Sequence, residues 1–138
     1  MNHRLFGEVM ELVHLDPFWG NTKTRAHTNS LYYAVKHGKC LEHRVDGALV
    51  GFCTYGFFTP EELETEIWDG NVVYSRESGE VLHFPKFQCR AGRREVFNFI
   101  RGIQDFMFEN YPGVETGKGL RLYAGGLQRN ATWYRKST

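Results

Sequence analysis

The chain has 138 residues, a hydrophobic share of 41%, an aromatic share of 15% and a formal net charge of +1. Such a composition indicates a packed globular protein with its own core and excludes a disordered chain. No run of about 18 apolar residues occurs, so we expect no membrane span, and the first residues lack the apolar stretch of a signal peptide. The three cysteines are widely spaced, which predicts reduced thiols and a cytoplasmic location.

The first third of the chain predicts two short amphipathic helices. Apolar residues at helical spacing predict a helix over residues 5–14, which ends before an Asp-Pro pair. Residues 16–28 are rich in Pro, Gly, Asn and Thr and predict an irregular loop. A second helix is expected over residues 29–36, with an Asn or Ser cap at its start and Gly38 at its end.

The middle of the chain predicts a hairpin, a helix and two strands. Two apolar stretches flank Asp46-Gly47, a pair that readily takes the positive φ angles of a tight turn, so residues 40–55 predict a β-hairpin. Thr59-Pro60 followed by two glutamates is typical of a helix start, with a cap, a proline and acids at the positive end of the dipole. Residues 71–75 and 80–88 are expected to be strands.

The last part predicts one long helix and a strand. The helix is expected over residues 94–111, and its core-facing members should be buried: Phe99, Ile100, Ile103, Phe106 and Met107. Residues 120–123 predict a further strand, followed by a short polar and aromatic tail. This order of elements predicts a single α/β (α+β) domain with a mostly antiparallel, twisted sheet flanked by helices.

The turn between the strand 80–88 and the long helix predicts an anion site. The turn reads Cys-Arg-Ala-Gly-Arg-Arg and leads into a helix start, where free N–H groups and the positive dipole end favour a phosphate. The residues expected to hold that phosphate are Gln88, Arg90, Gly92, Arg93 and Arg94. The same charges would lower the pKa of Cys89. A strand-to-helix connection with solvated arginines is an equally good interpretation of these residues.

Charge is also divided unevenly along the chain. Residues 1–85 carry seven basic and twelve acidic side chains, whereas residues 86–138 carry ten basic and four acidic ones. An anionic ligand or partner on one face would suit this asymmetry.

The order of elements, with a glycine- and arginine-bearing turn after a central strand, resembles the GNAT acyltransferase fold. Within that fold the sequence is most similar to the toxin-activating lysine acyltransferases. The segments that carry the likeness are 47–54 with 59–66, 79–92, and the glycine-bearing stretches 117–118 and 122–126. The resemblance implies an acyl donor, either acyl-CoA or the phosphopantetheine of an acyl carrier protein, and a protein amine as the acceptor.

The catalytic residues of that family are not matched. Its histidine, in the loop after the first helix, corresponds to Phe18 or Trp19, and its aspartate on the strand before the glycine turn corresponds to Lys86. The remaining catalytic candidates are His14 paired with Asp16, His83 on the strand, and Tyr134 near the end of the chain. A surface histidine at 14 and a satisfied sheet histidine at 83 are the simpler interpretations.

Three functions are therefore open. The first is an N-acyltransferase that uses a thioester donor. The second is a non-catalytic binding or assembly protein with an acyltransferase-like fold, for instance of phage origin. A nucleic-acid binder is a weaker third, because arginines alternate with Tyr123, Trp133 and Tyr134 while the total charge is near neutral. The six histidines lack ligand spacing, so we expect no metal.

Overall fold

The computed structural model describes residues 1–15, 25–111, 116–122 and 128–134; in the last two ranges it describes the backbone. In chain order the elements are α1 (His3–Leu15), α3 (Arg25–Lys36), β1 (Cys40–Val45), β2 (Ala48–Thr54), β3 (Gly56–Phe58), α4 (Pro60–Thr65), α5 (Gly70–Ser75), β4 (Val81–Phe84), β5 (Phe87–Cys89), α6 (Arg93–Asn110), β6 (Thr116–Leu122) and β7 (Gln128–Tyr134). The expected mixture of helices with mostly antiparallel strands is confirmed.

The strands form two sheets that are joined through continuous chain. The first has the order β1-β2-β5 and the second has the order β3-β4-β6-β7. All pairs are antiparallel except β4 with β6, which is parallel. Only Tyr55 separates β2 from β3, and only Pro85 and Lys86 separate β4 from β5. A hydrogen bond of 2.9 Å from the Thr54 amide to the Lys86 carbonyl carries the pairing across these breaks.

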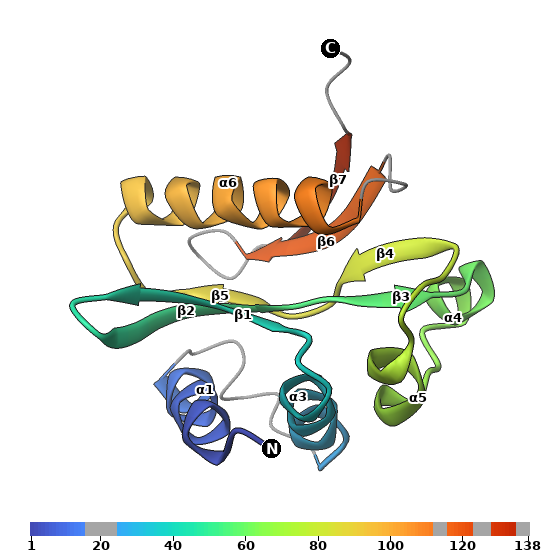
Figure 1. The fold of residues 1–138 in the computed structure, drawn as a ribbon, viewed down its shortest axis with the longest axis horizontal. Coiled ribbons are helices and arrows are strands. Elements are labelled where there is room, and N and C mark those ends of the chain that lie inside the picture. The colour runs from blue at the N-terminus through green and yellow to red at the C-terminus, as the bar shows by residue number, and fades with distance from the viewer. Residues whose placement is uncertain (16–24, 112–115, 123–127, 135–138) are drawn as a thin grey trace.

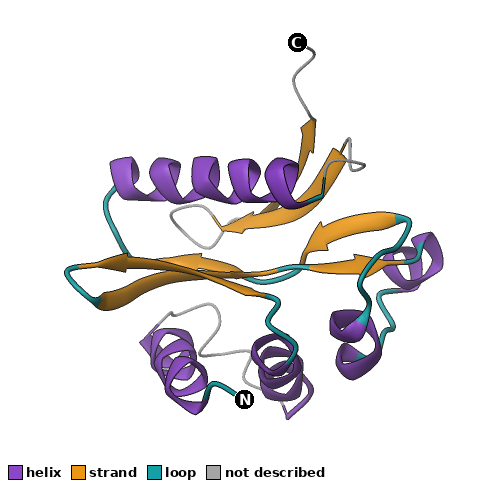
Figure 2. Ribbon diagram, in the orientation of Figure 1, coloured by secondary structure: helices purple, strands orange, loops and turns teal. Residues whose placement is uncertain are grey.

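Helices cover both faces of this strand surface. Figure 1 shows α1 and α3 on one face of the first sheet and α6 on the other, with α4 and α5 beside β3. Figure 2 shows the same three-layer arrangement by secondary structure. Because β4 and β6 are parallel, the chain must cross from one end to the other between them, and α6 makes that crossover. No helix in the described ranges is long and apolar enough to cross a membrane.

Two hydrophobic cores follow from these layers. The core on the α1 and α3 face is formed by Leu5, Val9, Leu12, Val13, Leu31, Val35, Leu49 and Phe52. The core on the α6 face is formed by Cys53, Tyr55, Phe57, Leu82, Phe84, Phe99, Ile103 and Met107. Neighbouring residues Phe52 and Cys53 thus serve opposite faces, as the two-residue period of a strand requires.

Several turns and helix caps form where the sequence predicts them. Asp46 and Gly47 both have positive φ, 52° and 83°, in the β1–β2 turn, and Gly38 has φ 69° just after α3. Thr59 and Glu62 form a reciprocal capping box, in which each side chain accepts a hydrogen bond from the other's backbone amide. The end of the long helix predicted at residues 112–113 lies outside the described residues.

Other predictions were wrong in type or extent. Residues 71–75 belong to the helix α5 and not to a strand, because the Asp69 carboxylate caps the amides of Asn71 and Val72. The expected tail contains the strand β7, which pairs with β6. The buried face of α6 is narrower than expected: Phe99, Ile103 and Met107 are buried, whereas Ile100 and Phe106 are only partly buried.

Candidate functional site

The candidate site is the segment Val81–Cys89 and the start of α6. Its first half, β4, is paired on both sides: with β3 antiparallel and with β6 parallel. The parallel pairing runs from Leu82 opposite Gly117 to Phe84 opposite Gly119 and ends there. Its second half, β5, pairs with β2 and is the edge of the first sheet. β6 remains close to β5, yet the two strands are not paired.

A one-residue bulge separates these two halves. Cys53 lies opposite Phe87 and Gly56 lies opposite His83. Between these two pairs the partner strands advance by three residues, from 53 to 56, whereas this segment advances by four, from 83 to 87. One extra residue is therefore inserted around Pro85. In agreement, Phe84 and Phe87 both face the α6 core, although residues three apart in a regular strand face opposite sides. A bulge of this kind bends the strand and often lies beside an active site.

The hydrogen bonds of β5 determine which backbone groups face outward. The Lys86 carbonyl accepts from Thr54, and the Arg90 amide donates to the Val50 carbonyl at 2.7 Å. In an antiparallel pair these groups alternate along the strand, so residues 86, 88 and 90 face β2. The N–H and C=O groups of Phe87 and Cys89 therefore face the other edge. No strand in the described ranges pairs with that edge.

The start of α6 combines free amides with opposing charges. Gly92 is the N-cap residue and supplies no side-chain cap. A Cβ at Gly92 would meet nothing within 4 Å, and its φ of −62° suits any residue, so glycine is not required there by the backbone. The side chains of Arg93 and Arg94 are exposed. Glu95, which follows them in the first turn, brings a negative charge to the same helix end.

Glu95 is held by a histidine that the sequence analysis did not single out. His43 Nε2 lies 2.7 Å from Glu95 Oε2, and the His43 ring stacks on Phe99 at 5.0 Å between centroids. Phe99 stacks in turn on Phe87 at 5.5 Å. His43 and Glu95 are 52 residues apart in the sequence, so no local pattern indicates that they pair. The one available signal was Glu95 itself, an acidic residue in the first turn of a predicted helix.

The structure gives Gln88 and Arg90 different partners from the predicted anion. Gln88 Nε2 donates to the Leu12 carbonyl at 2.6 Å, and Arg90 Nη1 donates to the Leu15 carbonyl at 2.8 Å. Both side chains thus satisfy carbonyl groups at the C-terminal end of α1, which lack partners within the helix. Gln88 is 2% exposed, and its Oε1 atom has no hydrogen-bond partner among the residues that the structure describes. Of the predicted group, Gly92, Arg93 and Arg94 remain together at the start of α6.

Two further ionisable groups of this segment have pKa values that differ from their ordinary ones. Burial lowers the pKa of the Lys86 ammonium to about 8, because the charged form loses water. Burial also raises the pKa of the Cys89 thiol, an effect that the Ala91 amide opposes and Glu95 reinforces. The prediction that the helix start lowers the pKa of Cys89 was therefore wrong, because loss of hydration outweighs the nearby amide.

The two predicted catalytic residues whose side chains the structure describes, His14 and His83, lie on different elements. His14 is exposed in the last turn of α1, which covers the first sheet. His83 lies in β4 of the second sheet, where its ring meets Phe58 edge to face at 5.1 Å. Asp16 lies outside the described residues. Tyr134 is the last residue of β7, and its side chain also lies outside them.

Metal-binding clusters and similar proteins give no further assignment. Among the side chains that the structure describes, no group of three His, Cys, Asp or Glu residues could hold a metal ion. The three cysteines are free thiols. No protein-family model matches the chain, and no curated protein matches its sequence. The geometry of the strand segment and of α6 is therefore the basis for any functional argument.

Proposed function

We propose that this protein binds the phosphopantetheine arm of an acyl thioester along the outer edge of β5 and transfers the acyl group to an amine. The observation that carries the proposal is the separation of β5 from β6 after the parallel β4–β6 pair. It leaves the backbone groups of Phe87 and Cys89 facing an edge with which no strand of the described residues pairs. Sheet edges of this kind accept an extended ligand through main-chain hydrogen bonds.

The chemistry of the donor suits this edge. A phosphopantetheine arm is extended and carries two amide groups, each with one donor and one acceptor, so it can pair with a strand edge. Its phosphate end would lie at the start of α6, where the amides after Gly92 lack a side-chain cap and Arg93 and Arg94 are exposed. Its thioester end would lie at the bulge around Pro85, where the β4–β6 pairing stops. Both ends thus have a physical reason for their placement.

Transfer itself requires an amine nucleophile and a thiol leaving group. The amine nitrogen attacks the thioester carbonyl, the C–S bond breaks, and the proton lost by the nitrogen goes to the departing sulfur. His83 lies on β4, the strand that leads into the bulge, and is the closest in sequence to it of the predicted proton carriers. His14 and His83 lie on different parts of the molecule, and this separation favours a second candidate function, in which the thioester is bound without catalysis.

Calorimetric titration with CoA tests the binding step. We expect Arg93→Glu to weaken CoA binding by about tenfold or more, because it reverses a charge at the phosphate end and one decade equals about 1.4 kcal/mol. The matched control is Arg101→Glu, which makes the same change at an exposed arginine farther along α6. Its effect should be several times smaller, since charges beyond about 10 Å are screened in ordinary buffer.

Two results would contradict the proposal. If CoA does not bind the parent protein, the edge of β5 does not serve a phosphopantetheine arm. If both variants weaken binding equally, attraction by net charge explains the binding and the start of α6 has no special role. Release of free thiol from acetyl-CoA in the presence of amines separates the two candidate functions: binding without thiol release supports the non-catalytic one.

A further inference from the structure

We propose that the amine which accepts the acyl group is the side chain of Lys86 in this same chain, so that the protein becomes acylated on its own strand bulge. This inference rests on the proposed thioester site, since the donor must lie along β5. It names an acceptor where the proposed function names only an amine. The residues that support it are Lys86 itself, Thr54 on the neighbouring strand, Tyr74 of α5 and Gln88.

The backbone of Lys86 lies at the end of the proposed donor path. Lys86 follows Pro85 in the bulge, at the point where β4 leaves β6 and the free edge of β5 begins. Its carbonyl is bonded to the Thr54 amide, so Thr54 is its cross-strand partner, and such partners have side chains on one face. The Thr54 hydroxyl lies 3.1 Å from the Tyr74 hydroxyl, on the face away from α6. Lys86 is half-buried there.

The chemical state of Lys86 suits a nucleophile. A lysine attacks a carbonyl only as the neutral amine, and with a pKa of about 8 roughly half of the Lys86 side chains are neutral at pH 8. An unperturbed lysine, with a pKa of about 10.4, is neutral in fewer than one molecule in a hundred at that pH. Burial therefore increases the reactive fraction by roughly two orders of magnitude.

Gln88 supplies an acceptor for the product. Acylation replaces the amine by an amide, whose N–H donates one hydrogen bond and carries no charge. Gln88 lies two residues after Lys86 on the same face, a spacing of about 7 Å along a strand, which a lysine stem can span. Its Oε1 atom is buried without a partner while its Nε2 atom is already bonded to Leu12. A buried acceptor without a donor is unfavourable, and the N–H of the acylated side chain, once turned toward Gln88, would satisfy it.

The reaction balances without a further reagent. The Lys86 nitrogen adds to the thioester carbonyl, the C–S bond breaks, and an amide remains on Lys86. The sulfur leaves and takes up the proton that the nitrogen loses, so one thiol is released for each acyl-lysine formed. No electron is transferred to or from an outside group.

Mass spectrometry with two thioesters tests the inference. The full-length protein is incubated at pH 8 with acetyl-CoA, and in parallel with the acetyl thioester of N-acetylcysteamine, which has the thiol end of the arm and no phosphate. Intact mass and peptide mapping then give the acetylation rate at each lysine. We expect Lys86 to react at least tenfold faster than Lys36, which is exposed on α3. Lys86→Arg should lose this reaction, with circular dichroism and thermal melting as the check on folding.

The outcomes separate this inference from the proposed function. If CoA binds and Lys86 reacts no faster than Lys36 with either donor, the inference is overturned and the donor site stands. If CoA does not bind but the phosphate-free thioester acetylates Lys86 selectively, the reactive amine is supported and the proposed donor site fails. Should Lys86→Arg fail to fold, the ratio of the Lys86 and Lys36 rates in the parent protein still decides.

Discussion

The two faces of the first sheet are held to their helices by different forces. On one face, α6 is attached mainly through stacked rings and aliphatic side chains, with Phe99 lying between His43 and Phe87, and by the 2.7 Å polar contact between His43 and Glu95. On the other face, α1 is attached through an apolar core and also through polar contacts at its middle and at its C-terminal end. The strands β1, β2 and β5 are shared by both faces, so the difference arises from the helices.

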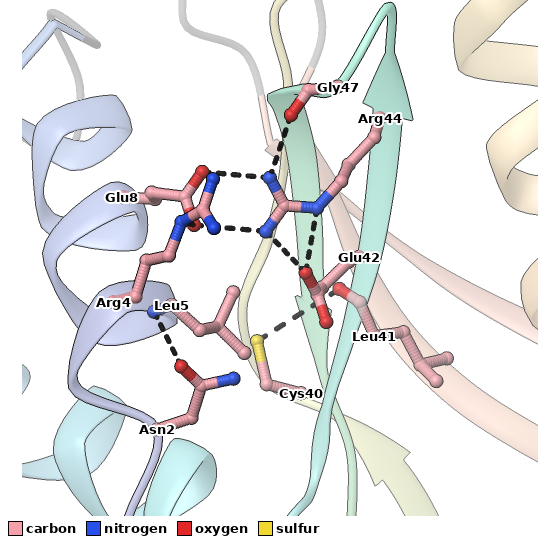
Figure 3. Close-up of polar contacts among 9 residues, drawn as sticks. All are labelled: Asn2, Arg4, Leu5, Glu8, Cys40, Leu41, Glu42, Arg44 and Gly47. Atoms are coloured by element: carbon pink, nitrogen blue, oxygen red, sulfur yellow. Dashed lines mark hydrogen bonds and ion pairs between the residues drawn. The ribbon is translucent and has the colours of Figure 1, made fainter.

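The polar contacts of α1 connect it to both edges of the first sheet. At its C-terminal end, Gln88 and Arg90 of β5 donate to α1 carbonyls. Near the middle of α1, the Glu8 carboxylate accepts a two-point contact from Arg44 of β1, at 2.8 and 2.9 Å, and Arg44 also contacts Glu42 at 2.6 Å (Figure 3). The Arg44 ion pairs should add little to the free energy of unfolding, because ion pairs near the surface contribute little, whereas the Gln88 hydrogen bond is buried and should contribute more.

The largest effect should come from the aromatic contact of α6. Phe99→Ala removes a buried ring that lies between two others, and we expect a loss of about 2–5 kcal/mol in the free energy of unfolding. Urea denaturation measures it. The matched control is Phe97→Ala, on the same helix, where the ring is 59% exposed and the change should be within about 0.5 kcal/mol. Equal losses in both variants would mean that α6 is not packed as described.

An intermediate effect is expected at the C-terminal end of α1. Gln88→Met keeps the size of the side chain but leaves the Leu12 carbonyl without its donor; a lost partner of this kind costs about 1–3 kcal/mol. Removal of the unpartnered Oε1 atom offsets part of this, so we expect a net loss of about 1 kcal/mol in urea denaturation. Arg90→Met removes the exposed counterpart and should cost less. A larger loss for Arg90→Met would reverse the proposed ranking of the two contacts.

The sequence was sufficient for elements defined by local signals. The positive-φ pair Asp46-Gly47, the Thr59–Glu62 capping box and the helical spacing of Phe99, Ile103 and Met107 are all short-range patterns, and each folds as predicted. The segment 71–75 misled the prediction because valine and tyrosine favour strands, whereas the Asp69 cap and the burial of Val73 and Tyr74 favour a helix. Tertiary packing overrode the local preference there.

The candidate site was less predictable because its contacts join distant residues. The alternation of residues 80–88 suggested one regular strand, and the bulge around Pro85 is visible only when the partner strand is placed beside it. Gln88 and Arg90 were grouped with the helix start because they are near it in sequence. A strand, however, sends Gln88 and Cys89 to opposite faces, and α1 lies on the face that Gln88 takes.

The smallest effect should come from the ion pair between Arg44 and Glu8, and it should depend on pH and salt. The hydrogen bond from Arg44 lowers the pKa of the Glu8 carboxyl below its ordinary value. A carboxyl with a lower pKa in the folded state stabilises the protein above its unfolded pKa of about 4.3, and this contribution disappears as the pH falls through the folded value. Glu8→Gln should therefore lower Tm slightly at pH 7, and this difference should shrink below pH 4 or so.

The control for that ion pair is Glu11→Gln, which makes the same change at an exposed position of α1. Added salt should reduce the effect of Glu8→Gln, because the screening length falls to about 3 Å at 1 M, and attraction between partly exposed charges weakens accordingly. Thermal melting of both variants at low and high salt, and at pH 7 and pH 3, measures these differences. If Glu8→Gln lowers Tm equally under all four conditions, its effect comes from packing and not from charge. The polar contacts of α1 would then differ little in kind from the apolar contacts that hold α6.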